Sequence, residues 1–216
     1  IKPEMKLYGI DSDEQMLEKA KQLLGDKLLG SVNSKHPVSL SGLDVSKSAL
    51  NLSSVIHEVY SYCTPEEIDA FWNGVNNSGY KYIIIRDMIR DVPKDRASDL
   101  TAYRTLQRFL NEKADEDLKK HVDEFENTWG SLKLQHNMVH FFLKYRYIYN
   151  WSREVKENYI PLGPWELIDK LDLDKYELVE TDVFTLPFIA EQVEKDFGIV
   201  LDNNTHIKLV LKRKGE

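Results

Sequence analysis

A single carboxylate, Asp11, directly follows a short apolar run, and an amphipathic helix is predicted to begin right after it, in the stretch LYGIDSDEQMLEKAKQ at positions 7–22. In open parallel sheets, ligands bind beyond the carboxyl ends of the strands, where an acid can accept hydrogen bonds from both hydroxyls of a ribose. Alternatively, Asp11 serves only as a solvated cap of the following helix. The pattern therefore indicates either a nucleotide-type cofactor site or a plain helix start.

A second group of reactive side chains follows the apolar run ALNLSSVIHEV at 49–59. We expect the chain to pass there from a strand into a loop, and loops at such places often carry function. His57 ordinarily titrates near pH 6.5, so it is a candidate general base, with Glu58 and Tyr60 beside it. The alternative is a loop whose polar residues hydrogen-bond locally.

Candidate substrate-binding groups come from three further places in the chain. Tyr62 closes the segment that contains His57, and Arg86 ends the apolar run YIIIRDM, where an internal ion pair with Asp87 is the alternative. The segment YRYIYNWSREVKENYIP at 145–161 is dense in aromatic and charged residues, and from it we select Tyr147, Trp151 and Arg153. A plain amphipathic helix packed on the sheet is the other interpretation of that segment.

His136 and His140 are spaced four residues apart, as two metal ligands on one face of a helix would be. No glutamate follows His136 directly, and apolar residues surround the pair, so packed or surface histidines are the better interpretation. Cys63 is the only cysteine, which excludes both a disulfide framework and a cysteine metal cluster. We predict no metal site.

The elements that must position these residues alternate between strand and helix patterns. A helix after Asp11 should stop at Gly25 or Gly30, and Thr64, Pro65 and Glu67 form a clear helix start. Predicted strands lie at 5–10, 37–44, 49–59 and 80–89, and two more follow in KYELVETDVFTL and THIKLVLKRK. This order predicts an α/β fold with a mostly parallel sheet flanked by helices.

The stretch LYGIDSDEQMLEKAKQ resembles the segment after the glycine-rich loop in class I S-adenosylmethionine (SAM)-dependent methyltransferases, and later elements follow that family's order. The resemblance implies a Rossmann-like sheet with an antiparallel last strand, SAM as cofactor, Asp11 on the ribose and Asp44 on the adenine side. It implies that His57, Glu58 and Tyr60 face the acceptor. The cofactor contacts that it implies are Gly9, Asp11, Ser12, Asp44, Val45 and Ser54.

The chain departs from this family in two places. The glycine-rich loop would precede Ile1, so we expect a strand and a Gly-x-Gly turn upstream. Only four residues separate Asp44 from Ala49, fewer than the family places there. We expect residues 1–95 and 151–216 to form the SAM-binding domain, with 96–150 as a helical insertion or lid over the carboxyl edge of the sheet.

Composition bounds the function further. The chain has 216 residues, 30% of them charged, and a net charge of −7, which makes nucleic acid a less favoured partner than a small-molecule or protein acceptor. No apolar stretch reaches the roughly 18 residues of a membrane helix, so we expect a cytoplasmic protein without membrane contact. The alternatives to methyl transfer are an NAD(P)-dependent oxidoreductase and an inactive methyltransferase-like binding protein.

Overall fold

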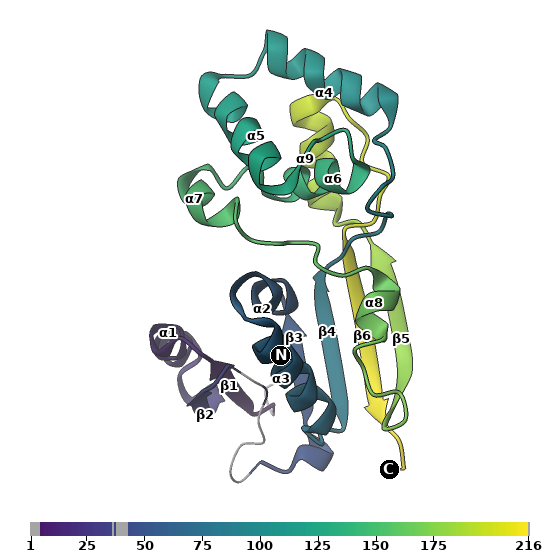
Figure 1. Cartoon of the computed structure of the whole chain (residues 1–216). Helices are drawn as coiled ribbons and strands as arrows, with labels where there is room; N and C mark the ends of the chain where they lie inside the picture. The colour runs from purple at the N-terminus through teal and green to yellow at the C-terminus, as the bar shows by residue number, and fades with distance from the viewer. Residues whose placement is uncertain (1–4, 36, 38–42, 216) are drawn as a thin grey trace.

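The strands of this chain form two separate sheets (Figure 1). The computed structural model describes residues 5–35, 37 and 43–215. Strands β1 (Leu7–Asp11) and β2 (Leu28–Asn33) pair in parallel. The second sheet has the order β3-β4-β6-β5, from β3 (Ala49–Ser53), β4 (Tyr82–Met88), β5 (Tyr176–Phe184) and β6 (His206–Arg213).

The four-stranded sheet is mixed. Strands β3 and β4 are parallel, whereas β6 is antiparallel to both β4 and β5. The fold is therefore mixed α/β. The antiparallel last strand is confirmed, but the prediction of one mostly parallel sheet is wrong for the described residues, because their strands divide into two sheets and half of the pairings are antiparallel.

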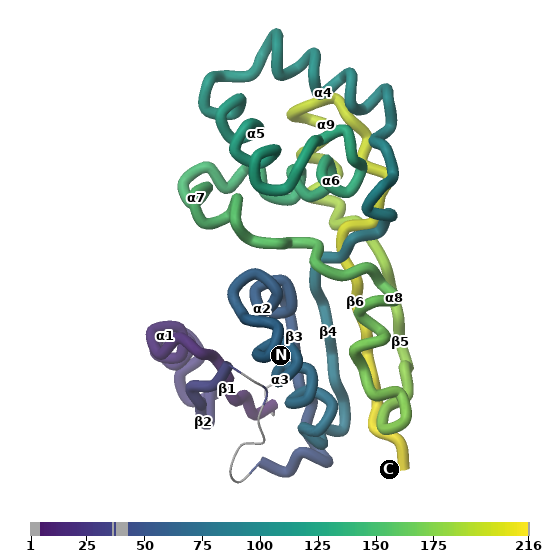
Figure 2. Tube along the Cα trace, viewed as in Figure 1, coloured from purple at the N-terminus to yellow at the C-terminus, as the bar shows by residue number. Residues whose placement is uncertain are grey.

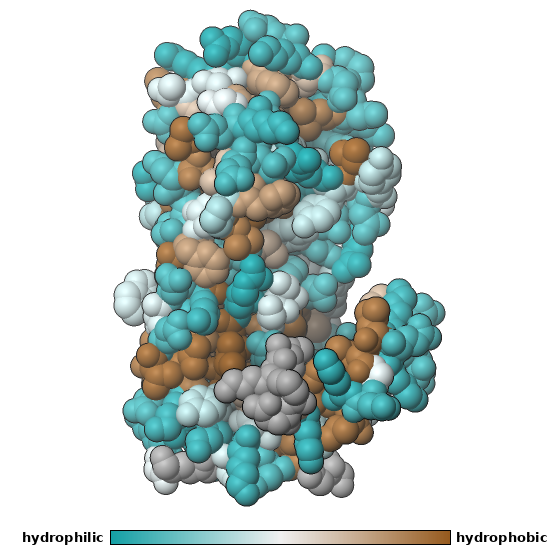
Figure 3. All heavy atoms as spheres, turned by 180° about the vertical axis from the view of Figure 1, so that it is seen from behind, coloured by the Kyte–Doolittle hydropathy of each residue, from teal (hydrophilic) through white to brown (hydrophobic). Residues whose placement is uncertain are grey.

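One face of the four-stranded sheet is covered by helices and holds the first core. Ile83 and Ile85 alternate with half-buried residues along β4 and are fully buried. They pack with residues of α2 (Ile56–Tyr62), α3 (Pro65–Asn77) and α8 (Pro164–Ile168). The predicted start of α3 is confirmed, since Thr64 and Glu67 form a reciprocal capping box. Seen from the other side, apolar side chains also gather over this sheet (Figure 3).

The predicted strand at 49–59 is corrected by the structure. Strand β3 ends at Ser53, and helix α2 begins at Ile56. Ser54 adopts a left-handed backbone conformation with φ of 56° between the two elements. The carboxylate of Asp87 accepts hydrogen bonds from the backbone N–H groups of Val55 and Ile56, and it thereby satisfies the first turn of a helix. A β-branched run thus becomes helical through a contact made by a distant residue.

The predicted strand at 37–44 lies largely outside the described residues. Of its described members, neither Leu43 nor Asp44 is in a strand, and Asp44 caps a short 3-10 turn, η2 (Val45–Lys47). Helix α1 (Glu14–Leu24) stops at Gly25, as expected, where φ is 53°. A 3-10 turn, η1 (Gly25–Lys27), then leads into β2, which we did not predict.

A second core lies beyond the carboxyl ends of β3 and β4 (Figures 1 and 2). It packs buried residues of the helices α4 (Leu100–Glu112), α5 (Glu116–Trp129), α6 (Gln135–Lys144), α7 (Trp151–Glu154) and α9 (Pro187–Phe197). A 3-10 turn, η3 (Ile148–Asn150), precedes α7. Helix α9 joins β5 to β6 and was not predicted. The domain division at 95 and 151 stays a prediction.

No helix in the described part of the chain combines the length and apolar character that crossing a membrane requires.

Candidate active site

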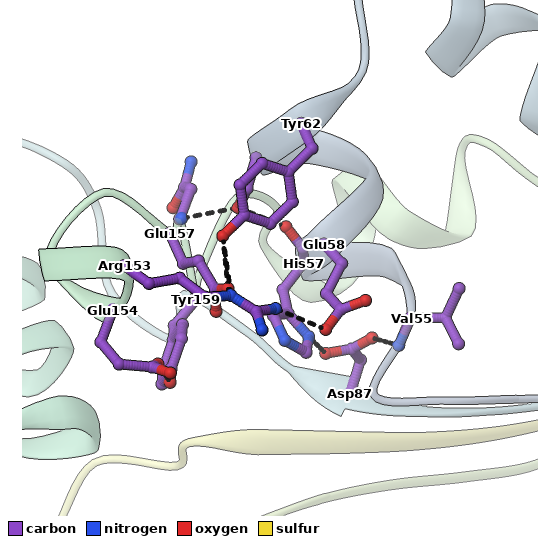
Figure 4. Close-up of polar contacts among 11 residues, drawn as sticks. Val55, His57, Glu58, Tyr62, Asp87, Arg153, Glu154, Glu157 and Tyr159 are labelled. Carbon is purple, nitrogen blue, oxygen red and sulfur yellow. Dashed lines mark hydrogen bonds and ion pairs between the residues drawn. The ribbon is translucent and has the colours of Figure 1, made fainter. Parts of the chain in front are cut away.

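A buried histidine–aspartate pair lies where β4 ends and α2 begins (Figure 4). The Nδ1 atom of His57 is 2.7 Å from Oδ1 of Asp87, and the two residues are 6% and 1% exposed. A carboxylate only accepts hydrogen bonds, so Nδ1 must carry the proton in this contact and the neutral ring has an unprotonated Nε2. The geometry therefore orients His57 to accept a proton at Nε2.

Backbone groups hold the carboxylate of Asp87 in position. Its Oδ2 accepts hydrogen bonds from the N–H groups of Val55 at 2.9 Å and Ile56 at 2.7 Å. Its Oδ1 also accepts one from the N–H of Met88 at 2.8 Å. Each of these donors belongs to the backbone near the end of a strand or the start of a helix, so the carboxylate that orients His57 is itself held by secondary structure.

The surroundings of His57 favour its protonated form. Burial alone would lower its pKa, but the hydrogen bond to Asp87 and the negative charges of Asp87, Glu58 and Glu157 outweigh burial. The pKa of His57 is consequently raised above its usual 6.5. A base with a raised pKa binds an abstracted proton more strongly, and it is fully deprotonated only at higher pH.

A cavity of about 480 Å³ opens beside this pair, between the end of the four-stranded sheet and the helical core. Sites for small ligands typically measure about 300–1,000 Å³. Four of the predicted site residues line it: Ser54, His57, Arg86 and Tyr147. The other walls come from β4, β6, α6 and α9 and from residues next to α6 and α9 and after α7, and we had not selected those residues. They are Met88, Phe142, Leu143, Tyr145, Arg146, Tyr159, Leu186, Phe188, Ile189, Gln192 and His206.

Three further predicted residues form a polar cluster next to His57 (Figure 4). Arg153 donates to Glu157 at 2.8 Å and lies 3.4 Å from Glu58, and the hydroxyl of Tyr62 donates to Glu157 at 2.5 Å. Burial, and more weakly the charges of Glu157 and Asp11, raise the pKa of Glu58.

The remaining predicted residues lie away from the cavity wall. Tyr60 accepts a hydrogen bond from Trp72, and Trp151 is buried in the helical core, where it stacks on His121 and donates to Glu124. Asp44 is engaged by Ser46 and Lys47 in a local turn. Gly9 lies within β1, Ser12 follows Asp11 before the start of α1, and Val45 begins the η2 turn. Their cofactor or substrate roles stay predictions.

His140 is a core residue in this structure. It is 1% exposed, contacts the rings of Phe125 and Trp129 edge-on, and accepts a hydrogen bond at Nε2 from the backbone N–H of Tyr159. Burial holds its pKa well below 6.5. Among the described residues, no three His, Cys, Asp or Glu side chains come together in a way that could hold a metal ion.

A buried lysine next to His140 was not anticipated from the sequence. The ammonium of Lys144 is fully buried and donates to the backbone carbonyls of Glu154 at 2.9 Å and Glu157 at 2.6 Å. It also lies 4.6 Å from the centre of the Tyr159 ring. Burial lowers the pKa of Lys144 to about 7, although the charges of Glu157 and Glu154 act in the opposite direction.

This lysine should make the stability of the protein depend on pH. Between the folded pKa of about 7 and the ordinary 10.5, the unfolded chain binds the proton of Lys144 more strongly, so unfolding becomes harder as pH rises. We expect a gain of roughly 2–5 kcal/mol in unfolding free energy across this window, which Lys144→Met abolishes. Denaturant unfolding at a series of pH values measures it, with exposed Lys133→Met as control. Equal slopes in all three proteins would contradict the prediction.

Comparison with known proteins yields distant structural similarities to solved structures, among them the following two. No protein-family model and no curated protein sequence matches the chain. PKMT2 from Rickettsia typhi in complex with AdoHcy aligns with a TM-score of 0.46 and 11% identity, over 99% of this chain and 45% of that one. The MccD protein aligns with a TM-score of 0.41 and 12% identity, over 97% of this chain and 80% of that one. This chain thus spans less than half the length of PKMT2. Both TM-scores lie below 0.5.

Proposed function

We propose that this chain binds SAM and directs methyl transfer to an acceptor held in the cavity beside His57. The observation that carries this proposal is the buried His57–Asp87 pair, whose histidine lines a cavity of about 480 Å³ at the carboxyl ends of β3 and β4. Ligands of α/β folds characteristically bind at such strand ends. The resemblance of the segment around Asp11 to SAM-dependent methyltransferases supports SAM as the ligand.

The carboxyl ends of β1 and β2 carry polar side chains suited to binding a ribose. Asp11 and Asn33 are paired at the carboxyl ends of β1 and β2, so a carboxylate and an amide stand next to each other. The Oδ1 atom of Asp11 accepts the N–H of Asp13 at 2.8 Å, which fixes the side chain, and neighbouring lone pairs remain for ligand hydroxyls. These groups are the kind that hold the two hydroxyls of a ribose. Asp11 would therefore hold the cofactor.

His57 would supply the proton chemistry. Bound SAM supplies an electrophilic methyl group, whose transfer forms a bond to the acceptor, breaks the carbon–sulfur bond and leaves that electron pair on sulfur as a thioether. The Nε2 atom of His57 accepts the proton that the acceptor hydroxyl or amine loses, and Asp87 stabilises the resulting imidazolium. The proton then leaves from Nε2 to water. Apolar side chains of α6 and α9 line the cavity and would limit the access of water to these groups.

Removing the carboxylate of Asp11 should weaken cofactor binding. A ribose loses two charge-assisted hydrogen bonds in Asp11→Ala, each worth roughly 1.5–3 kcal/mol, so AdoHcy affinity should fall more than about tenfold. Asp11 lies at a strand tip, and its removal should leave the fold intact. Titration calorimetry with AdoHcy measures the change, and Glu18→Ala on the exposed face of α1 is the matched control.

Titration with NAD tests the alternative that the protein is an NAD(P)-dependent oxidoreductase. We expect SAM and AdoHcy to bind and NAD to leave the calorimetric signal and the melting temperature unchanged. Unaltered AdoHcy affinity in Asp11→Ala would remove Asp11 from the site, and tight binding of NAD without binding of AdoHcy would overturn the proposed function.

A further inference from the structure

The wall of the cavity carries positive charge. Arg86 and Arg146 line it, and no aspartate or glutamate does among the described residues. This contrasts with the whole chain, whose net charge is −7. In a recess with low-dielectric walls, a fixed positive charge favours an anionic ligand over a neutral one of the same shape.

Arg86 is the cation that a ligand would meet. Arg146 is already paired, since it donates to Asp196 at 2.8 Å and also contacts Gln192. The half-buried side chain of Arg86 makes no hydrogen bond or ion pair with any residue that the structure describes. Its cross-strand neighbour Lys208 is paired with Glu180 at 2.6 Å. Arg86 therefore lines the cavity without a counter-ion from the described part of the chain.

The neighbouring His206 adds no second charge. It is buried at the start of β6, where it stacks on Phe184 and lies 2.8 Å from the hydroxyl of Thr205. Burial, followed by the charge of Arg86, lowers the pKa of His206 to about 4, so the ring is neutral near pH 7. One uncompensated positive charge matches a singly charged carboxylate, which a guanidinium binds through two parallel hydrogen bonds. A doubly charged phosphate would need a second free cation.

The rest of the wall is mainly apolar and aromatic. Phe142 and Leu143 come from α6, and Leu186, Phe188 and Ile189 come from α9 and the residue before it. Such walls bind the hydrocarbon part of a ligand by removing apolar surface from water. The cavity thus combines an apolar body, a cation on one strand and a base at the adjacent helix start.

We propose that the methyl acceptor is a small molecule with an apolar body and a single carboxylate. Its hydrocarbon part packs against α6 and α9, its carboxylate pairs with Arg86, and the atom to be methylated lies at Nε2 of His57. This assignment rests on the proposed function, and it names the class of substrate for that site.

Binding of simple probes tests the charge preference without any turnover. Phenylacetate and octanoate have the required features, and phenylacetamide and octanamide are their neutral counterparts. In titration calorimetry with AdoHcy present, each carboxylate should bind at least about tenfold more tightly than its amide. Arg86→Gln should abolish this difference and leave the affinity for the amides unchanged. Arg104→Gln, on an exposed position of α4, should behave as the unaltered protein does.

Three results would overturn the proposal. The first is equal or tighter binding of the amides to the unaltered protein, and the second is a carboxylate preference that survives in Arg86→Gln. The third is the absence of binding for all four probes up to about 5 mM, a concentration at which even a weak small-molecule site fills. AdoHcy affinity is measured on the same protein samples. If the unaltered protein does not bind AdoHcy, the proposed function is wrong, whatever the carboxylate preference.

Discussion

Replacing His57 with glutamine is expected to lower kcat/KM for methyl transfer by about 10²–10⁴-fold, the range that a positioned general base contributes. Glutamine can still donate to Asp87, so the variant keeps the buried hydrogen bond but has no group that can take a proton. AdoHcy affinity and melting temperature should stay the same. The rate of AdoHcy formation with an accepted small molecule measures the loss.

The pH profile separates this role from a purely structural one. In the unaltered protein, kcat/KM should rise with pH, and the midpoint of this rise should lie above pH 6.5. His57 must lose its proton before it can act as a base, and Asp87 raises the pKa at which this happens. This rise, the acidic limb of the pH profile, should be absent in His57→Gln. His121→Gln, at a histidine stacked on Trp151 in the helical core, is the control and should retain the limb. A His57→Gln protein with an unchanged rate and profile would refute the assignment of the base.

Replacing Asp87 with alanine is expected to have the largest effect on stability. The change leaves the N–H groups of Val55 and Ile56 without an acceptor and removes the partner of buried His57. Each unsatisfied buried group costs roughly 1–3 kcal/mol, and breaking one side of a buried pair costs about 3–5 kcal/mol. We therefore expect a loss of about 3–5 kcal/mol in unfolding free energy, measured by denaturant unfolding.

Asp87→Asn tests the electrostatic part of this contact. The amide oxygen can still accept from the start of α2, so the loss of stability should be smaller than in Asp87→Ala. Without the carboxylate charge, the pKa of His57 should fall, and the acidic limb of kcat/KM should move to lower pH while the rate drops. Asp123→Ala, at an exposed position on α5, controls for the loss of an acid. Equal stability of Asp87→Ala and the unaltered protein would contradict the described contacts.

The sequence predicted those elements whose stability is local. The continuous apolar run of β4, the capping box of α3 and the closing pair β5 and β6 were recognisable because each pattern is complete within its own segment. The helical character of 96–150 was visible for the same reason. Residues of β4, β6 and 96–150 line part of the cavity, so the sequence could propose a candidate site at the end of β3 and β4.

Other features depend on contacts between distant residues. The segment 55–59 was predicted as the end of a strand, yet a helix begins at Ile56 because Asp87 satisfies its first N–H groups. Lys144 is buried because the carbonyls of Glu154 and Glu157 and the Tyr159 ring converge on it from a later segment. No spacing rule within one segment reveals either arrangement. The apolar walls from α9 were missed because that helix was not recognised.

We propose that Asp11 holds a SAM-type cofactor whose reacting end faces the cavity lined by His57 and Arg86. A crystal structure of the protein grown with AdoHcy tests this most directly. We expect density for AdoHcy with both ribose hydroxyls on the carboxylate of Asp11 and its sulfur facing the cavity that His57 lines. AdoHcy bound elsewhere on the molecule, with Asp11 free of ligand, would contradict it, as would a protein that takes up no AdoHcy in crystals or in solution calorimetry.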